Sequence, residues 1–139
     1  MSRVHDHYLP LAPEHDMQAR IDDQGRLRTA SAELGTLGWT WMLEIQYTAP
    51  GLWRLPGITV AEHDRPRFTQ YLEPRQSGKR LLNLNGIDDL TAVTLSPQGC
   101  RLSSQARLLG FPRPPLDDGP LVIIAPHPDD AELAAYGLY

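Results

Sequence analysis

The chain has a single cysteine, Cys100, among its 139 residues. No intrachain disulfide can form, and a reducing cytoplasm is the simplest setting for such a protein. The chain also lacks any run of the roughly 18 to 20 apolar residues that a membrane-spanning helix needs. Its first twenty residues are rich in acidic groups and histidine and have no apolar centre, so we expect no secretory signal peptide.

Neither positive nor negative charge is in large excess. Thirteen basic and 17 acidic residues give a net charge of −4. A protein with this balance has no electrostatic footprint for nucleic acid or for an anionic membrane surface. The apolar content of 41% and the charged content of 22% are ordinary for a soluble globular protein. The length suits one domain, or one domain and the beginning of another.

The first thirty residues are polar, contain Pro10 and Pro13, and have no sustained apolar period. They are predicted to be a polar N-terminal tail. The one local structure expected there is a short hairpin over Ile21 to Leu27, turning at Asp23-Gln24-Gly25.

Residues 31–111 have the pattern of a β domain. From Trp39 to Tyr47 every odd position is apolar, and the even positions are polar except Met42. This period of two places five large side chains on one face of a sheet. Further strand candidates, separated by turn-forming residues, are 57–60, 67–72, 80–85, 92–97 and 100–109. Pro97 is expected to stop the strand that begins at Ala92. Several short strands at this spacing are typical of a β-sandwich or small barrel.

A proline-rich stretch at 112–120 is predicted to be a semi-rigid linker and the main domain boundary. The chain changes character after it. Leu121 to Ala125 is continuously apolar, as in a strand covered on both faces. A turn and a helix start follow. The fold expected is therefore mainly β, with a sandwich-like domain followed at 121–139 by the first β-α unit of an α/β domain whose remainder is missing.

The turn after Ala125 holds His127-Pro128-Asp129-Asp130. Side chains that follow a parallel strand of an α/β sheet face the crevice where ligands bind. An imidazole and two adjacent carboxylates there can hold a divalent metal and still leave one carboxylate for proton transfer. The bland alternative is a turn in which an aspartate caps a helix.

The sequence Ala125-Pro126-His127-Pro128-Asp129-Asp130-Ala131-Glu132-Leu133 resembles the N-terminal signature of the PIG-L/LmbE-like deacetylases. The resemblance covers about 19 residues, 121–139, and the strand, the motif and the helix start agree in order and spacing. It implies a truncated Rossmann-like α/β domain that uses zinc to hydrolyse the N-acetyl group of a GlcNAc-type sugar or sugar conjugate.

The resemblance also assigns roles to individual residues. His127 and Asp130 would be metal ligands, and Asp129 would be the general base. The family's third ligand is a histidine much further along the chain, so we expect these 139 residues alone to be inactive. The parent would be a cytoplasmic hydrolase acting on an N-acetylated sugar. Leu121 to Ala125 has no sheet partner of its own, and we expect it to join the edge of the sandwich or to pair between chains.

The competing hypothesis is a non-catalytic β-sandwich that binds carbohydrate or protein and carries a vestigial deacetylase tail. A third alternative is that a second polypeptide completes the α/β domain. Reading the gene beyond Tyr139 separates these alternatives, because the deacetylase needs roughly 150 to 200 further residues and a late histidine.

Histidines elsewhere could replace the missing metal ligand. His5, His7, His15 and His63 are the candidates, although a solvated tail and an ordinary surface histidine explain them more simply.

Aromatic side chains could form a surface for stacking sugars. Trp39, Trp41 and Tyr47 alternate with aliphatic residues, which favours core packing, whereas Trp53 sits in a predicted loop and is the better candidate for exposure. Cys100 has no activating neighbour in the sequence and is expected to be an inert thiol.

Overall fold

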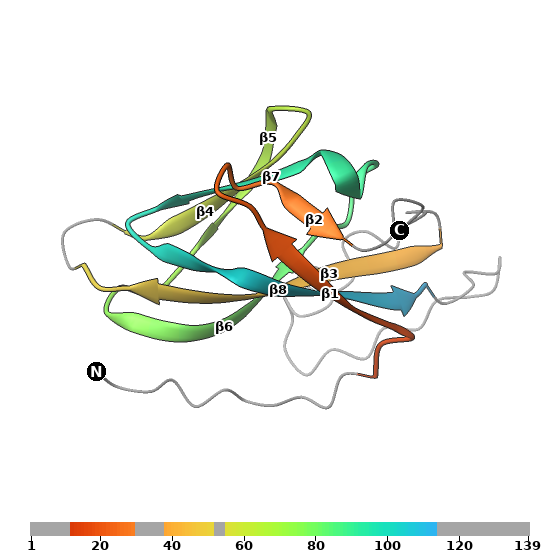
Figure 1. The fold of residues 1–139 in the computed structure, drawn as a ribbon, viewed down its shortest axis with the longest axis horizontal. Coiled ribbons are helices and arrows are strands. Elements are labelled where there is room, and N and C mark those ends of the chain that lie inside the picture. Colours follow the sequence, from red (N-terminus) through yellow and green to blue (C-terminus); the bar gives the residue numbers. More distant parts are fainter. Residues whose placement is uncertain (1–11, 30–37, 52–54, 114–139) are drawn as a thin grey trace, which may run out of the picture.

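The structure is a computed structural model that describes residues 12–29, 38–51 and 55–113. Eight β-strands and one short 3-10 helix lie in these ranges (Figure 1). They are β1 (His15–Ile21), β2 (Leu27–Thr29), β3 (Trp39–Ala49), β4 (Gly57–Glu62), β5 (Arg65–Tyr71), β6 (Gln76–Asn83), the 3-10 helix η1 (Leu90–Ala92), β7 (Val93–Gln98) and β8 (Arg101–Pro112).

The strands form two antiparallel sheets. The larger sheet has five strands in the order β2-β1-β8-β3-β6, and the smaller has three in the order β5-β4-β7. After the β4–β5 hairpin the chain passes from one sheet to the other with each new strand. The central orders β1-β8-β3-β6 and β7-β4-β5 are those of a jelly roll, an architecture built from two Greek keys.

One strand departs from this architecture. In a regular jelly roll the second strand extends the smaller sheet beside β7. Here β2 pairs with β1, and this part of the chain meets β7 only at a bridge between Arg26 and Thr94. The larger sheet therefore has an extra edge strand, and most of one side of β7 has none of the described strands beside it.

Pro97 limits what can pair with this side of β7. The Leu95 N–H donates to the Gly25 carbonyl at 2.8 Å, so it points toward the β1–β2 turn. In an antiparallel ladder alternate residues direct their N–H groups to the same side, and the next such group would belong to residue 97. Proline has no N–H, so pairing on this side of β7 cannot continue past Leu95.

The core lies between the sheets. Leu43 and Ile45 of β3 are fully buried and pack in one cluster with Ile58 and Val60 of β4. The odd residues of β3 face this core, and the even residues face outward, because successive side chains of a strand point to opposite faces. The predicted period of two in this segment is confirmed, and the mainly β fold with it.

The sandwich begins earlier in the sequence than expected. Strands β1 and β2 lie in the stretch predicted to be a polar tail, and β1 pairs with β8 from His15 to Arg20. Met17, Ala19 and Ile21 supply its inward face, a set too small to stand out as an apolar period. The sandwich boundary therefore lies before His15 and not at residue 31. The predicted hairpin over Ile21 to Leu27 is confirmed, since β1 pairs with β2 around that turn.

The other strand predictions are confirmed with small shifts at their ends. The one correction concerns Pro97, which was expected to end its strand, whereas β7 runs on to Gln98. Proline is tolerated there because its missing N–H faces the side of β7 that has no strand. Within the described ranges, no helix is long and apolar enough to cross a membrane.

Candidate functional site

The motif residues His127, Asp129 and Asp130 lie outside the described residues, as do the linker from residue 114 onward and the apolar run Leu121 to Ala125. The last described strand, β8, ends at Pro112, where the predicted linker begins. The motif therefore belongs to none of the eight described strands.

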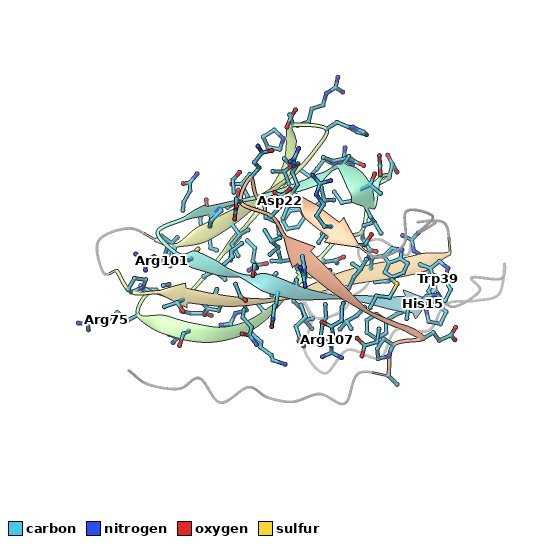
Figure 2. The ribbon with its side chains drawn as sticks, in the orientation of Figure 1. His15, Asp22, Trp39, Arg75, Arg101 and Arg107 are labelled. Carbon is cyan, nitrogen blue, oxygen red and sulfur yellow. The ribbon has the colours of Figure 1, made fainter. Side chains whose placement is uncertain are left out.

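Of the histidines considered as substitute ligands, the structure describes His15 and His63, and each has different neighbours. His15 stacks on the aromatic rings of β3, with its ring centroid 4.3 Å from that of Trp39 and 5.7 Å from that of Trp41 (Figure 2). His63 lies in the β4–β5 turn at a positive φ of 47°, and its Nε2 is 3.7 Å from Asp89 Oδ2. His5 and His7 lie outside the described residues.

In the part of the chain that the structure describes, no three histidine, cysteine, aspartate or glutamate side chains gather where they could hold a metal ion. A catalytic zinc takes three protein ligands. The sandwich thus offers no metal centre of its own within 12–29, 38–51 and 55–113.

The aromatic residues of β3 are core residues for the most part. Trp41 and Tyr47 are each 3% exposed, which confirms the core-packing prediction for both. Trp41 lies over Gly110, whose absent Cβ would stand 2.6 Å from the indole ring, so only glycine fits beneath it. Trp39 is half-buried beside His15 at the end of the sandwich, and Trp53 lies outside the described residues.

Cys100 is half-buried, and its thiol donates a weak hydrogen bond to the Gly57 carbonyl at 3.5 Å. Burial raises the pKa of this thiol above its ordinary value of 9.0. A thiol with a raised pKa is a poor nucleophile at neutral pH, which agrees with the predicted inert role.

The outward face of the larger sheet carries a row of alternating charges across four strands. Arg107 of β8 binds Asp16 of β1 through two nitrogens and approaches Glu44 of β3 at 3.3 Å. Lys79 of β6 completes the row at 3.1 Å from Glu44. A hydrogen bond from Arg107 lowers the pKa of Asp16, and the same bond raises the pKa of Arg107. Two positive and two negative charges cancel, so this row leaves no charge unpaired for a ligand.

A pocket of about 470 Å³ opens where β2 has left β7. We call it the turn pocket. It is lined by the β1–β2 turn with the end of β1 (21–25), by the side of β7 without a strand (95–97), and by the start of β8 (102–104). The β1–β2 turn is distant in the sequence from the other two segments, which lie on either side of the β7–β8 turn, and the jelly-roll order brings them together.

A bulge in β8 shapes one wall of the turn pocket. The pairing of β3 with β8 passes from Ile45–Ala106 to Tyr47–Leu102, so three residues of β8 stand opposite Gln46 alone. Ser103 turns its Oγ to accept the Gln105 N–H at 3.1 Å. Bulges re-aim the side chains of a strand, and here the bulge brings two serines to the pocket.

The opposite wall is held by Asp22, which lies at the β1–β2 turn (Figure 2). Its Oδ1 accepts the backbone N–H groups of Arg26 at 2.9 Å and Gln24 at 3.0 Å, and its Oδ2 accepts side-chain N–H groups from Arg26 and Arg28. These hydrogen bonds lower the pKa of Asp22 to about 2. The backbone N–H of Arg26 has the largest effect, and the Arg26 side chain, the Gln24 N–H and the Arg28 side chain add to it.

The turn pocket could not be found by reading the sequence in windows. The turn itself was predicted, but Ser96, Ser103 and Ser104 have no local pattern that marks a site. Their proximity to Asp22 depends on β8 returning beside β1, some 80 to 90 residues later in the chain.

The fold and the turn pocket together define a jelly-roll domain with a small, partly polar pocket. Comparisons with family models, with curated proteins and with solved structures found no match.

Proposed function

We propose that this chain is the N-terminal portion of a zinc-dependent deacetylase that hydrolyses the N-acetyl group of a GlcNAc-type sugar or sugar conjugate. The observation that carries the proposal is the segment 121–139, in which an apolar strand, His-Pro-Asp-Asp and a helix start follow one another. The sandwich is then an accessory domain, joined to a Rossmann-like catalytic domain by the linker at 112–120.

The arrangement of the described strands supports this division. All eight strands lie between His15 and Pro112, and they enclose one continuous core. None of them requires the motif segment as a partner within the described ranges. Described strands that pack around a core of their own ahead of the linker suit the role of a module placed before a catalytic domain.

The donor chemistry of the motif suits zinc. His127 supplies an imidazole nitrogen and Asp130 a carboxylate, both ordinary zinc ligands, and a third ligand is expected from a histidine beyond Tyr139. Bound zinc supplies Lewis acidity, which lowers the pKa of water toward neutrality. Asp129 then takes the proton of the attacking water and returns it to the leaving amine.

A second function is favoured by a separate observation. The turn pocket is lined by described residues of the sandwich. A non-catalytic module that binds carbohydrate through this pocket is therefore the alternative to an enzyme.

Metal binding by the 139-residue chain gives a first test. Two ligands without the third leave an incomplete site, so we expect zinc to bind no tighter than on the order of micromolar, as measured by calorimetry. Stoichiometric nanomolar binding would contradict the missing-ligand account and would make His5, His7, His15 or His63 the substitute. The matching test on activity is acetate release from an N-acetylglucosaminyl substrate by the protein extended beyond Tyr139. We expect activity from the extended protein and none from the 139 residues.

A further inference from the structure

We infer that the turn pocket is a binding site for a short, neutral saccharide. The inference does not depend on the deacetylase motif, because it is argued from described residues of the sandwich alone.

The pocket has the size and the division of surfaces that a small-molecule site needs. Its volume of about 470 Å³ falls within the range of roughly 300 to 1,000 Å³ typical of ligand pockets. Among its lining residues, Pro97 is exposed and Leu102 is half-buried. They provide apolar surface for the carbon face of a sugar ring.

The rim provides hydrogen-bonding groups that the protein leaves unused. Asp23, Ser96 and Ser104 are exposed, and their side chains have no hydrogen-bond partner among the described residues. Ser103 accepts one bond through its Oγ and keeps its own hydroxyl hydrogen to donate. A carboxylate and hydroxyls around an apolar surface match the alternating hydroxyl and carbon faces of a sugar.

The charges of the pocket favour a neutral ligand over an anion. No lysine or arginine is among the described residues that line it. Arg26 and Arg28, which follow the β1–β2 turn, are turned onto Asp22, 3.0 and 3.1 Å from its Oδ2. Asp23 keeps its negative charge unpaired, so a phosphate or carboxylate ligand would meet repulsion.

The same features disfavour an added peptide strand. A peptide that binds by extending a sheet needs a row of free backbone groups along one edge. On β7 the Leu95 N–H is already bound to Gly25, and Pro97 has no N–H to offer. This side of β7 is closed to strand addition.

In the experiment, the 139-residue chain is titrated with each probe, and two-dimensional amide NMR spectra record the response. The probes are N,N′-diacetylchitobiose, cellobiose and inorganic phosphate. We expect either or both disaccharides to shift the amide signals of residues 21–25, 95–97 and 102–104, with a dissociation constant on the order of millimolar.

Three variants keep the result specific. Ser104→Tyr fills the pocket and should weaken sugar binding at least tenfold, whereas Ser77→Tyr places the same ring on the exposed outward side of β6 and should leave binding unchanged. Asp23→Ala removes an acceptor without adding volume and gives a second reading if Ser104→Tyr fails to fold.

The absence of shifts at the pocket for both disaccharides, or larger shifts with phosphate than with either sugar, would overturn the inference. Loss of binding in Ser77→Tyr equal to that in Ser104→Tyr would overturn it as well. None of these results bears on zinc or on acetate release, so this site and the deacetylase proposal fail independently.

Discussion

Two turns at the ends of the sandwich contain the same two stabilising features, but each turn depends mainly on a different one. In each, a carboxylate accepts two backbone N–H groups and a glycine adopts a positive φ. The β1–β2 turn has Asp22 and Gly25, and the loop after β6 has Glu62, reaching across from β4, and Gly86.

The difference lies in burial and clearance. Asp22 is near the surface, whereas Glu62 is 6% exposed and accepts the N–H groups of Asp88 and Asp89 at 2.8 and 2.7 Å. The glycines show the opposite pattern, because the crowded one lies in the turn whose carboxylate is near the surface. A Cβ on Gly25 would stand 2.2 Å from the Leu95 carbonyl oxygen, whereas a Cβ on Gly86 would meet nothing within 4 Å. One turn depends on close backbone contact with β7, and the other depends on a buried charge.

The largest effect should come from Glu62. We expect Glu62→Ala to lower the free energy of unfolding by about 3 kcal/mol, because two backbone N–H groups lose a charged acceptor in a largely buried place. Chemical denaturation monitored by circular dichroism measures the change. Glu62→Gln keeps an oxygen acceptor and should lose less. Equal losses in the two variants would mean that the charge, paired with Arg67 at 3.6 Å, matters more than the acceptor.

The two glycines give the next effect. Alanine at positive φ costs about 1 kcal/mol, so Gly86→Ala should lose about that amount. Gly25→Ala must also move the turn away from β7 and break the bond between the Leu95 N–H and the Gly25 carbonyl, for a loss of about 2 to 3 kcal/mol in all. The same denaturation experiment ranks the pair. If the free energy of unfolding falls by equal amounts in the two variants, the close contact at Gly25 does not contribute to stability.

The smallest effect concerns acid. The pKa of Asp22 falls from an ordinary 3.8 to about 2 in the folded protein. A depressed pKa means that the folded state favours the charged form, so its contribution is present above pH 3.8 and is lost as the pH falls toward 2. We expect the melting temperature of Asp22→Asn to lie below that of the unaltered chain at pH 7 and to converge with it near pH 2.

Asp23→Asn is the matched control for the acid experiment, since the neighbouring carboxylate has no ion pair among the described residues. Its melting curve should stay parallel to that of the unaltered chain across the same pH range. Parallel curves for Asp22→Asn as well would show that this carboxylate does not stabilise the turn.

The same contrast explains how much of the fold could be predicted. The β1–β2 turn lies within five residues of sequence, and its turn-forming residues predict it. The period of two in β3 likewise needs only a nine-residue window. The anchor at Glu62 joins groups 26 and 27 residues apart, and no local pattern marks it. β1 escaped prediction because only Met17, Ala19 and Ile21 face the core, and pairing with β8 supplies what its own sequence does not.

The candidate sites divide in the same way. His127, Asp129 and Asp130 stand together in the sequence, so the chemistry of a metal-assisted hydrolase can be predicted without a fold. The turn pocket combines the β1–β2 turn with residues of β7 and β8 that come much later in the chain, and Pro97 at its edge ends the pairing of β7 on that side. Neither Pro97 nor the serines carry that information until the strand order is known.

The most direct test of the deacetylase proposal compares two adjacent carboxylates in the protein extended beyond Tyr139. Zinc content and acetate release are measured for the unaltered protein, Asp129→Asn and Asp130→Asn. The account predicts that Asp129→Asn retains zinc and loses at least about 100-fold in turnover, because only the general base is removed. Asp130→Asn should lose zinc and activity together. Normal turnover by Asp129→Asn would contradict the account.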